Sequence, residues 1–112
     1  MIHLINSKQF NKVYSNGIKF FSKNFLIYFY KNNYNENRLG FVTSKKVGNA
    51  VKRNRIRRIF REVYRLNEEI FPKGYDIIFI AKRNFGNNIK IINYHTIKKE
   101  TINLLKRVNI KW

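Results

Sequence analysis

The residues most able to do chemistry lie between Ser44 and Arg65, and the chemistry they suit is phosphate binding. This stretch holds nine basic side chains and one acid, Glu62. The nine are Lys45, Lys46, Lys52, Arg53, Arg55, Arg57, Arg58, Arg61 and Arg65. A guanidinium group binds phosphate through two parallel hydrogen bonds and stacks on bases, and an ammonium group does neither. The concentration of arginine in one segment therefore predicts a surface for a polyanion.

Residues that could carry out catalysis are sparse. The six acids are scattered, and no two have a spacing typical of a catalytic dyad or a two-metal nuclease site. They are Glu36, Glu62, Glu68, Glu69, Asp76 and Glu100. His3 and His95 have no neighbour that suggests a metal cluster or an activated nucleophile, and the chain lacks cysteine and any glycine-rich phosphate-binding motif. We therefore expect no catalytic residue, metal site or cofactor in the protein itself.

Composition narrows the remaining possibilities. The 112 residues carry 24 Lys and Arg against six Asp and Glu, a net charge of +18, and 44% of them are apolar. A chain of this size and apolar content can form one packed domain, which we place at residues 1–112. The charge favours a phosphate-rich partner. Because there is no apolar run of spanning length, no signal-peptide pattern and no cysteine, we expect a soluble, cytoplasmic protein.

The basic segment must be helical if its charges are to share one surface. Winding residues 51–66 at about 100° per residue places apolar side chains on one arc and most of the arginines, with Asn54, on the opposite arc. The apolar arc consists of Ile56, Ile59, Phe60, Val63 and Leu66. Asn49 is a suitable N-cap. The pattern predicts an amphipathic helix with one face in the core and the other toward a polyanion.

Other elements must support this helix. They are a short helix at residues 7–17, strands at 24–30, 38–43 and 75–82, and a last helix from about residue 93. The inner face of the last helix would carry Tyr94, Ile97, Thr101, Leu104, Leu105 and Val108. We expect the first two strands to form a hairpin, the third to be central because its apolar run is nearly continuous, and residues 84–88 to be a loop. The pattern is that of an α/β (α+β) two-layer sandwich.

The strand at residues 24–30 presents a second surface. Its side chains alternate between a face of Phe25, Ile27 and Phe29 and a face of Leu26, Tyr28 and Tyr30. Tyrosine hydroxyls tolerate water, so the second face suits the stacking of unpaired bases. Phe10 and Tyr14 lie one turn apart on the first helix, and periodicity alone allows both to be core residues or part of this surface.

A basic amphipathic helix has other uses. It could lie on an anionic membrane or be a calmodulin target, but so small a domain needs its apolar face for the core. A nucleic acid is the favoured partner, and the aromatic strand favours single-stranded RNA over a DNA major groove. Composition alone leaves open a non-catalytic RNA-binding protein of ribosomal or RNA-chaperone type.

Residues 44–61, SKKVGNAVKRNRIRRIFR, closely resemble the signature of the bacterial ribonuclease P protein component. The early helix with Phe10 and Tyr14, and the strands that begin near Phe25, Arg38 and Tyr75, follow in the order expected of that family. The resemblance implies the element order α-β-β-β-α-β-α and a small, mainly antiparallel sheet with three helices. It also implies a left-handed βαβ crossover, against the usual right-handed preference.

The resemblance further implies a function. The family's protein is a subunit of an endoribonuclease ribonucleoprotein that removes the 5′ leader from precursor tRNA, and its RNA subunit holds the catalytic Mg²⁺ ions. The implied partners are the catalytic RNA and precursor tRNA, with no membrane and no obligate protein partner.

Two sets of binding residues carry over from the family to this chain. The surface against the catalytic RNA would be Lys45, Lys46, Asn49, Lys52, Arg53, Asn54, Arg55, Arg57, Arg58, Arg61 and Arg65. The cleft for the leader would be Phe10, Tyr14, Leu26, Tyr28, Phe41 and Arg53. The chain departs from the family at two places: Met1–Ile5 carries no Lys or Arg, and Tyr14 stands where relatives often have Phe.

Overall fold

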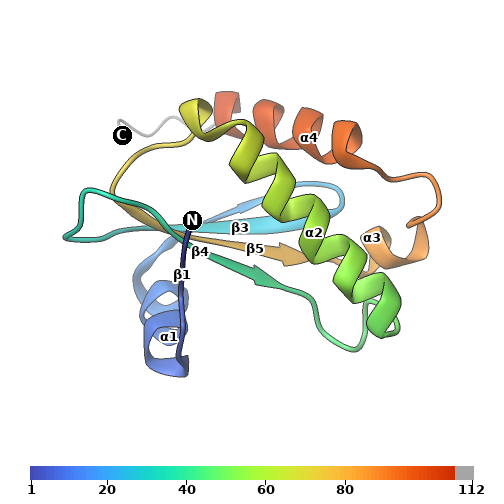
Figure 1. Cartoon of the computed structure of the whole chain (residues 1–112), viewed down its shortest axis with the longest axis horizontal. Coiled ribbons are helices and arrows are strands. Elements are labelled where there is room, and N and C mark those ends of the chain that lie inside the picture. Colours follow the sequence, from blue (N-terminus) through green and yellow to red (C-terminus); the bar gives the residue numbers. More distant parts are fainter. Residues whose placement is uncertain (108–112) are drawn as a thin grey trace.

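The computed structural model describes residues 1–107, which form a five-stranded sheet with helices on both faces (Figure 1). In chain order the elements are β1 (Ile2–His3), α1 (Ser7–Asn16), β2 (Ile18–Phe21), β3 (Phe25–Lys31), β4 (Arg38–Val42), α2 (Ala50–Leu66), the 3-10 helix η1 (Glu68–Ile70), β5 (Tyr75–Ala81), α3 (Arg83–Asn87) and α4 (Tyr94–Arg107). Helices α2 and α4 cover one face of the sheet, and α1 lies on the other (Figure 1). Val108, expected on the last helix, lies outside the described residues. Within residues 1–107 no helix has the length and apolar character to cross a membrane.

The strands lie in the order β1-β4-β5-β3-β2, so the predicted central position of β5 is confirmed. The predicted hairpin between β3 and β4 is wrong, because β5 lies between them. β5 pairs antiparallel with β3 over seven residue pairs and parallel with β4 over five residue pairs. β5 is apolar on both faces, so burial favours it at the centre over the half-exposed β4. A βαβ crossover is present, since α2 joins the parallel neighbours β4 and β5, and its left-handedness stays a prediction.

Three short elements were not expected from the sequence. β1 pairs in parallel with β4 and forms one edge of the sheet. The 3-10 helix η1 continues the chain beyond α2. Residues 84–88, predicted as a loop, lie largely in the five-residue helix α3, which buries Phe85 and Gly86. Sequence periodicity cannot identify elements of two to five residues, because none of them completes two turns or alternations.

The main core lies between the sheet and helices α2 and α4. Phe60 of α2 is fully buried, and its ring centroid lies 5.7 Å from that of Phe25, 5.2 Å from that of Phe79 and 5.5 Å from that of Phe85. Ile56 and Val63, one turn to either side of Phe60, are also fully buried. The apolar arc predicted for α2 is therefore confirmed at these positions.

The apolar arc predicted for α2 is wrong at Leu66, its last residue. Leu66 is 51% exposed, whereas Tyr64 is buried. The hydroxyl of Tyr64 accepts a hydrogen bond from the amide of Asn37, and its ring packs on Phe71. Because α2 ends at Leu66 and the chain turns into η1, the sheet no longer covers that side chain.

A smaller core lies on the α1 face of the sheet. It contains Leu4, Val13 and Ile78, and the partly buried Phe10 and Tyr28 pack against it. Phe10 sits over Gly40 of β4 so closely that a Cβ at Gly40 would lie 2.6 Å from the Phe10 ring. The single helix α1 leaves much of this face open, as the half-buried state of the strand residues around it shows.

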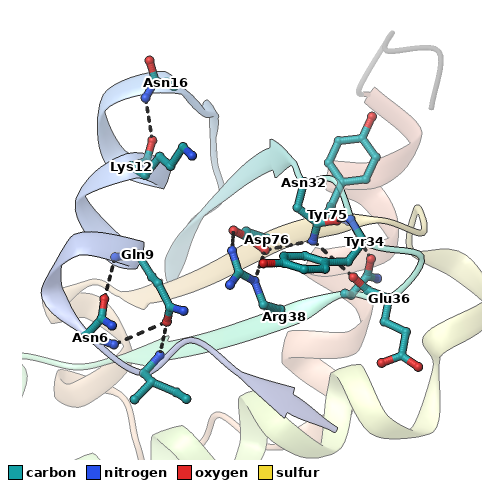
Figure 2. A network of polar contacts seen from close by, with 12 residues as sticks. Asn6, Gln9, Lys12, Asn16, Asn32, Tyr34, Glu36, Arg38, Tyr75 and Asp76 are labelled. Atoms are coloured by element: carbon teal, nitrogen blue, oxygen red, sulfur yellow. Dashed lines mark hydrogen bonds and ion pairs between the residues drawn. The ribbon is translucent and has the colours of Figure 1, made fainter.

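Buried polar groups at one end of this face form a network (Figure 2). The guanidinium of Arg38 donates two hydrogen bonds to the carboxylate of Asp76, at 2.8 and 2.7 Å, and the amide of Asn32 donates a third at 2.9 Å. The hydrogen bond to Asp76 raises the pKa of Arg38 above its usual value. The network provides hydrogen-bond partners for the buried carboxylate of Asp76 and joins β4 to β5.

We predict that Gly86→Ala destabilises the fold. A Cβ at Gly86 would lie 1.7 Å from the carbonyl oxygen of Val47, so α3 could no longer pack against the loop that leads into α2. We expect a loss of about 1–3 kcal/mol or more in the free energy of unfolding, measured in urea. Gly48→Ala is the matched control, because its Cβ would meet only the flexible side chain of Lys52. Equal stability of Gly86→Ala and wild type would contradict the predicted close approach.

Candidate nucleic-acid interface

Helix α2 and the loop before it form a basic surface. The side chain of Asn49 accepts a hydrogen bond from the backbone N–H of Lys52 at 2.9 Å, which caps the helix as predicted. Val47 anchors the loop by burying its side chain in the main core. We define the basic surface as the exposed Lys45, Lys46, Lys52, Arg55, Arg58, Arg61 and Arg65 with the half-buried Arg57.

The arginines of this surface are unneutralised. Within residues 1–107 the only ion pair joins Arg38 to Asp76, away from α2. Arg57 instead donates a hydrogen bond to the side chain of Asn54. A shallow groove on the outer side of α2 is lined by Val51, Asn54, Arg55, Arg57, Arg58 and Arg61. The groove offers several guanidinium groups to one anionic ligand.

Five of the six acids lie away from the basic surface, and the sixth, Glu62, is half-buried on α2 and forms no ion pair within residues 1–107. Glu100 accepts hydrogen bonds from Ser22 and Asn24, and Asp76 is bound to Arg38. A pocket at the other end of α2, beside η1, is lined by Met1, Ile2, Asn35, Glu36, Asn37, Leu39, Tyr64, Glu68, Glu69 and Lys73. No three His, Asp or Glu side chains in the described part of the chain come close enough to share a metal ion. The basic surface thus runs along the whole of α2, and Glu36, Glu68 and Glu69 gather beyond its C-terminal end.

The second surface lies on the α1 face of the sheet and consists of Phe10, Tyr14, Leu26 and Tyr28, which we call the aromatic surface. The ring centroids of Tyr14 and Tyr28 are 5.1 Å apart with an edge-to-face angle of 72°, and those of Phe10 and Tyr14 are 6.2 Å apart. Tyr14 is 37% exposed. Partial burial, followed by the neighbouring Tyr28, raises the pKa of Tyr14, so its hydroxyl stays neutral at physiological pH.

Periodicity alone left open whether Phe10 and Tyr14 are core residues or part of the aromatic surface, and the structure shows that they differ. Phe10 is partly buried over Gly40 and packs against the small core, while Tyr14 is exposed on one edge and touches Tyr28. Both residues help to hold α1 on the sheet, and both contribute to one continuous aromatic surface.

Two residues predicted for the leader cleft are not part of this surface. Phe41 points to the opposite face of the sheet, where its ring lies 5.8 Å from Phe79 and 6.0 Å from His3. Strand alternation is the reason, since Gly40 and Val42, not Phe41, face α1. Arg53 lies on α2, across the sheet from α1, and donates a hydrogen bond to the carbonyl of Gly48 at 2.9 Å. The structure therefore brings together Phe10, Tyr14, Leu26 and Tyr28 and separates them from the other two.

Sequence reasoning missed Lys19, which belongs beside the aromatic surface. Its ammonium nitrogen lies 5.5 Å from the centroid of the Tyr28 ring. Lys19 pairs with Tyr28 across the β2–β3 ladder, so both side chains point to the α1 face. The four residues 18–21 are too few to show which face of the sheet Lys19 takes, and only the register of the β2–β3 ladder shows it.

Comparisons with known proteins show which protein family this chain is similar to. The family model described as Ribonuclease P matches residues 2–109. The chain is 44% identical over 102 residues to the ribonuclease P protein component of Fusobacterium nucleatum, covering 91% of this chain and 92% of that protein.

Solved structures agree. The ribonuclease P protein of Thermotoga maritima matches with a TM-score of 0.87 at 30% identity, covering 98% of this chain and all of that one. The corresponding Staphylococcus aureus protein matches with a TM-score of 0.82 at 28% identity, covering 95% of this chain and 94% of the other.

Proposed function

Because the chain belongs to the ribonuclease P protein family, we propose that its two surfaces bind two different RNAs within one ribonucleoprotein. The protein is a component of an endoribonuclease that acts in tRNA processing, and its partner is the ribonuclease P RNA. The basic surface binds that RNA, and the aromatic surface binds the single-stranded 5′ leader of precursor tRNA. The observation that carries this proposal is that α2 and α1 lie on opposite faces of the sheet (Figure 1).

The basic surface suits a folded RNA. Its guanidinium groups line a shallow groove and have no carboxylate partner within residues 1–107, so they are available for phosphates. The acids beside η1 would repel a phosphate backbone beyond the C-terminal end of α2. This uneven distribution of charge favours one orientation of the helix on the RNA.

The aromatic surface suits unpaired bases. Tyr14 and Tyr28 offer ring faces and hydroxyl groups at a partly open surface, and Lys19 supplies a cation beside them. Stacking on such rings tolerates any base, which fits a leader whose sequence differs among tRNA precursors. None of the residues that make up the aromatic surface is acidic, and Glu100 of α4 directs its carboxylate to Ser22 and Asn24 at the β2–β3 turn.

We further propose that the chemistry of cleavage belongs to the RNA subunit, with Mg²⁺ held there. The buried Asp76 and the half-buried Glu100 accept hydrogen bonds from neighbouring side chains, and no metal-binding group of three forms within residues 1–107. The role of the protein is then to bind and orient both RNAs. Such an assembly works where tRNA precursors are made, which in a bacterium is the cytoplasm.

A non-catalytic protein of ribosomal or RNA-chaperone type would also be small and basic. Family membership disfavours it, because the match runs over nearly the whole chain and the relatives are ribonuclease P protein components.

We predict that the protein stimulates cleavage of precursor tRNA by its cognate RNA at low Mg²⁺, and more strongly for substrates with a leader of several nucleotides. Single-turnover cleavage with and without protein measures this effect. Protein without RNA should leave the substrate intact. Equal stimulation of substrates with short and long leaders would contradict leader binding.

We predict that Arg58→Ala and Arg61→Ala each weaken binding to the catalytic RNA. Each should also reduce the slope of log affinity against log salt by about one, because one phosphate contact is lost. Filter binding across a salt series gives both quantities. Lys73→Ala removes an exposed cation beside the acidic pocket and should leave the slope unchanged. If the Arg58 and Arg61 variants keep the wild-type slope, these side chains do not contact phosphate.

We predict that Tyr28→Ala weakens binding of leader-bearing precursor tRNA to the holoenzyme by roughly 1–3 kcal/mol, the usual contribution of one stacked base. Tyr28→Phe keeps the ring and should retain most of the affinity. Mature tRNA, which has no leader, is the control substrate. An equal loss for mature tRNA would indicate damage to the fold and would contradict the stacking role.

A further inference from the structure

The aromatic surface continues beyond Tyr28 to the edge of the sheet. In the β2–β3 ladder Lys19 pairs with Tyr28 and Phe21 pairs with Leu26. Directly paired side chains point to the same face, so Lys19 and Phe21 extend the row that contains Tyr28 and Leu26. Phe21 is the most open of these aromatic rings, at 56% exposed.

Folding does not explain an exposed phenylalanine at this position. Its neighbour Phe20 packs against the main core and places its ring 5.9 Å from that of Phe29. The Phe21 ring belongs to neither apolar cluster of the described residues. An exposed ring contributes little to folding, whereas a ligand that covered it would gain the burial of its apolar area.

Two ammonium groups flank the Phe21 ring. The nitrogen of Lys19 lies 5.1 Å from its centroid and that of Lys82 lies 5.5 Å away. Both distances are within the range of a cation–π contact. Because Lys19 also approaches Tyr28, it stands between the two rings. The cluster therefore alternates ring and cation along one path, as a polynucleotide alternates base and phosphate.

The backbone around Phe21 is held in place from several sides. Arg107 donates a hydrogen bond to the carbonyl of Phe21 at 3.3 Å, and Lys82 donates one to the carbonyl of Ser22. The nearby carboxylate of Glu100 accepts hydrogen bonds from Ser22 and Asn24 at the β2–β3 turn. The Phe21 ring is thus presented by a turn that several hydrogen bonds hold in place.

We propose that Phe21, Lys19 and Lys82 form a second stacking position for single-stranded RNA, adjoining the aromatic surface. A base stacks on Phe21, and the phosphates between it and the base at Tyr28 lie at the ammonium groups of Lys19 and Lys82. The inference rests on the proposed function, because the RNA that reaches Phe21 is the part of the leader that runs on from Tyr28.

The opposite end of the sheet offers a contrast. Tyr34 is equally open, at 59% exposed, and the guanidinium of Arg38 lies 4.8 Å from its ring centroid. That guanidinium, however, is neutralised by Asp76, and Glu36 is close by in the chain (Figure 2). An anionic strand gains no free cation there, so the charges direct the leader toward Phe21.

The test is the affinity of holoenzymes carrying Phe21→Ala, Tyr28→Ala or Tyr34→Ala for precursor tRNAs whose leaders lengthen one nucleotide at a time. We expect Tyr28→Ala to weaken binding once the leader reaches the aromatic surface. Phe21→Ala should weaken it by about 5- to 100-fold only for longer leaders, the range expected for one stacked base. Tyr34→Ala, the matched control, should follow wild type throughout. The thermal midpoint of Phe21→Ala should equal that of wild type.

The outcomes separate this inference from the proposed function. If Tyr28→Ala loses leader affinity and Phe21→Ala matches wild type at every length, the second position is wrong and the proposed function stands. If neither variant responds to leader length, both are wrong. A loss by Phe21→Ala that already appears with mature tRNA would overturn the inference, since Phe21 would then act elsewhere.

A second measurement reports stacking directly. A 2-aminopurine base placed at successive leader positions should lose fluorescence where it stacks, and Phe21→Ala should restore the fluorescence at one position beyond that affected by Tyr28→Ala. Phe21→Trp should keep the quenching, because it keeps a ring. Quenching at that position that persists in Phe21→Ala would overturn the assignment.

Discussion

The burial of Phe60 among the rings of Phe25, Phe79 and Phe85 is the contact on which the rest of the molecule depends. It sets the rotation of α2 about its own axis. A helix turns by about 100° per residue, so a shift of one position would carry an arginine into a core of phenylalanine rings. Burying an unpaired guanidinium there would cost several kcal/mol. The packing of one apolar side chain thus determines that the charges of α2 face outward, where the proposed contact with RNA needs them.

The sheet separates the two binding surfaces. Along each strand alternate side chains point to opposite faces, so Phe25 and Phe29 pack under α2 and α4 while Leu26 and Tyr28 face α1. The α2 face is closed by two helices, whereas α1 alone leaves part of its face open to solvent. A small protein can therefore keep a dry core on one side and a wettable aromatic surface on the other. The proposal that the protein binds two RNAs at once depends on this separation of the two surfaces by one sheet.

The sequence predicted some features of the site better than others. The arginine face of α2 and its cap at Asn49 were correct, because helical periodicity and capping depend on residues close together in the chain. The pairing of β3 with β4 was wrong, because strand pairing depends on residues far apart, and β5 competes for the central position. Phe41 was expected beside α1 but packs on the main core, because the face that a strand residue takes depends on its position in the sheet. The role of Arg53 in the leader cleft stays a prediction. Lys19 was missed because a four-residue strand carries too little pattern to reveal its register.

Several properties are determined by the sequence itself. The high positive charge, the arginines on one arc of a helix and the scattered acids are matters of composition and local spacing, and they point to a protein that binds a polyanion such as RNA. The tertiary structure alone decided that α1 and α2 lie on opposite faces of the sheet, that Tyr14 meets Tyr28, and that Lys19 and Phe21 continue that surface. These facts follow from β5 taking the centre of the sheet and from the register of β2 on β3. Both are long-range choices made by burying the most apolar surface, and no local pattern in the chain records them.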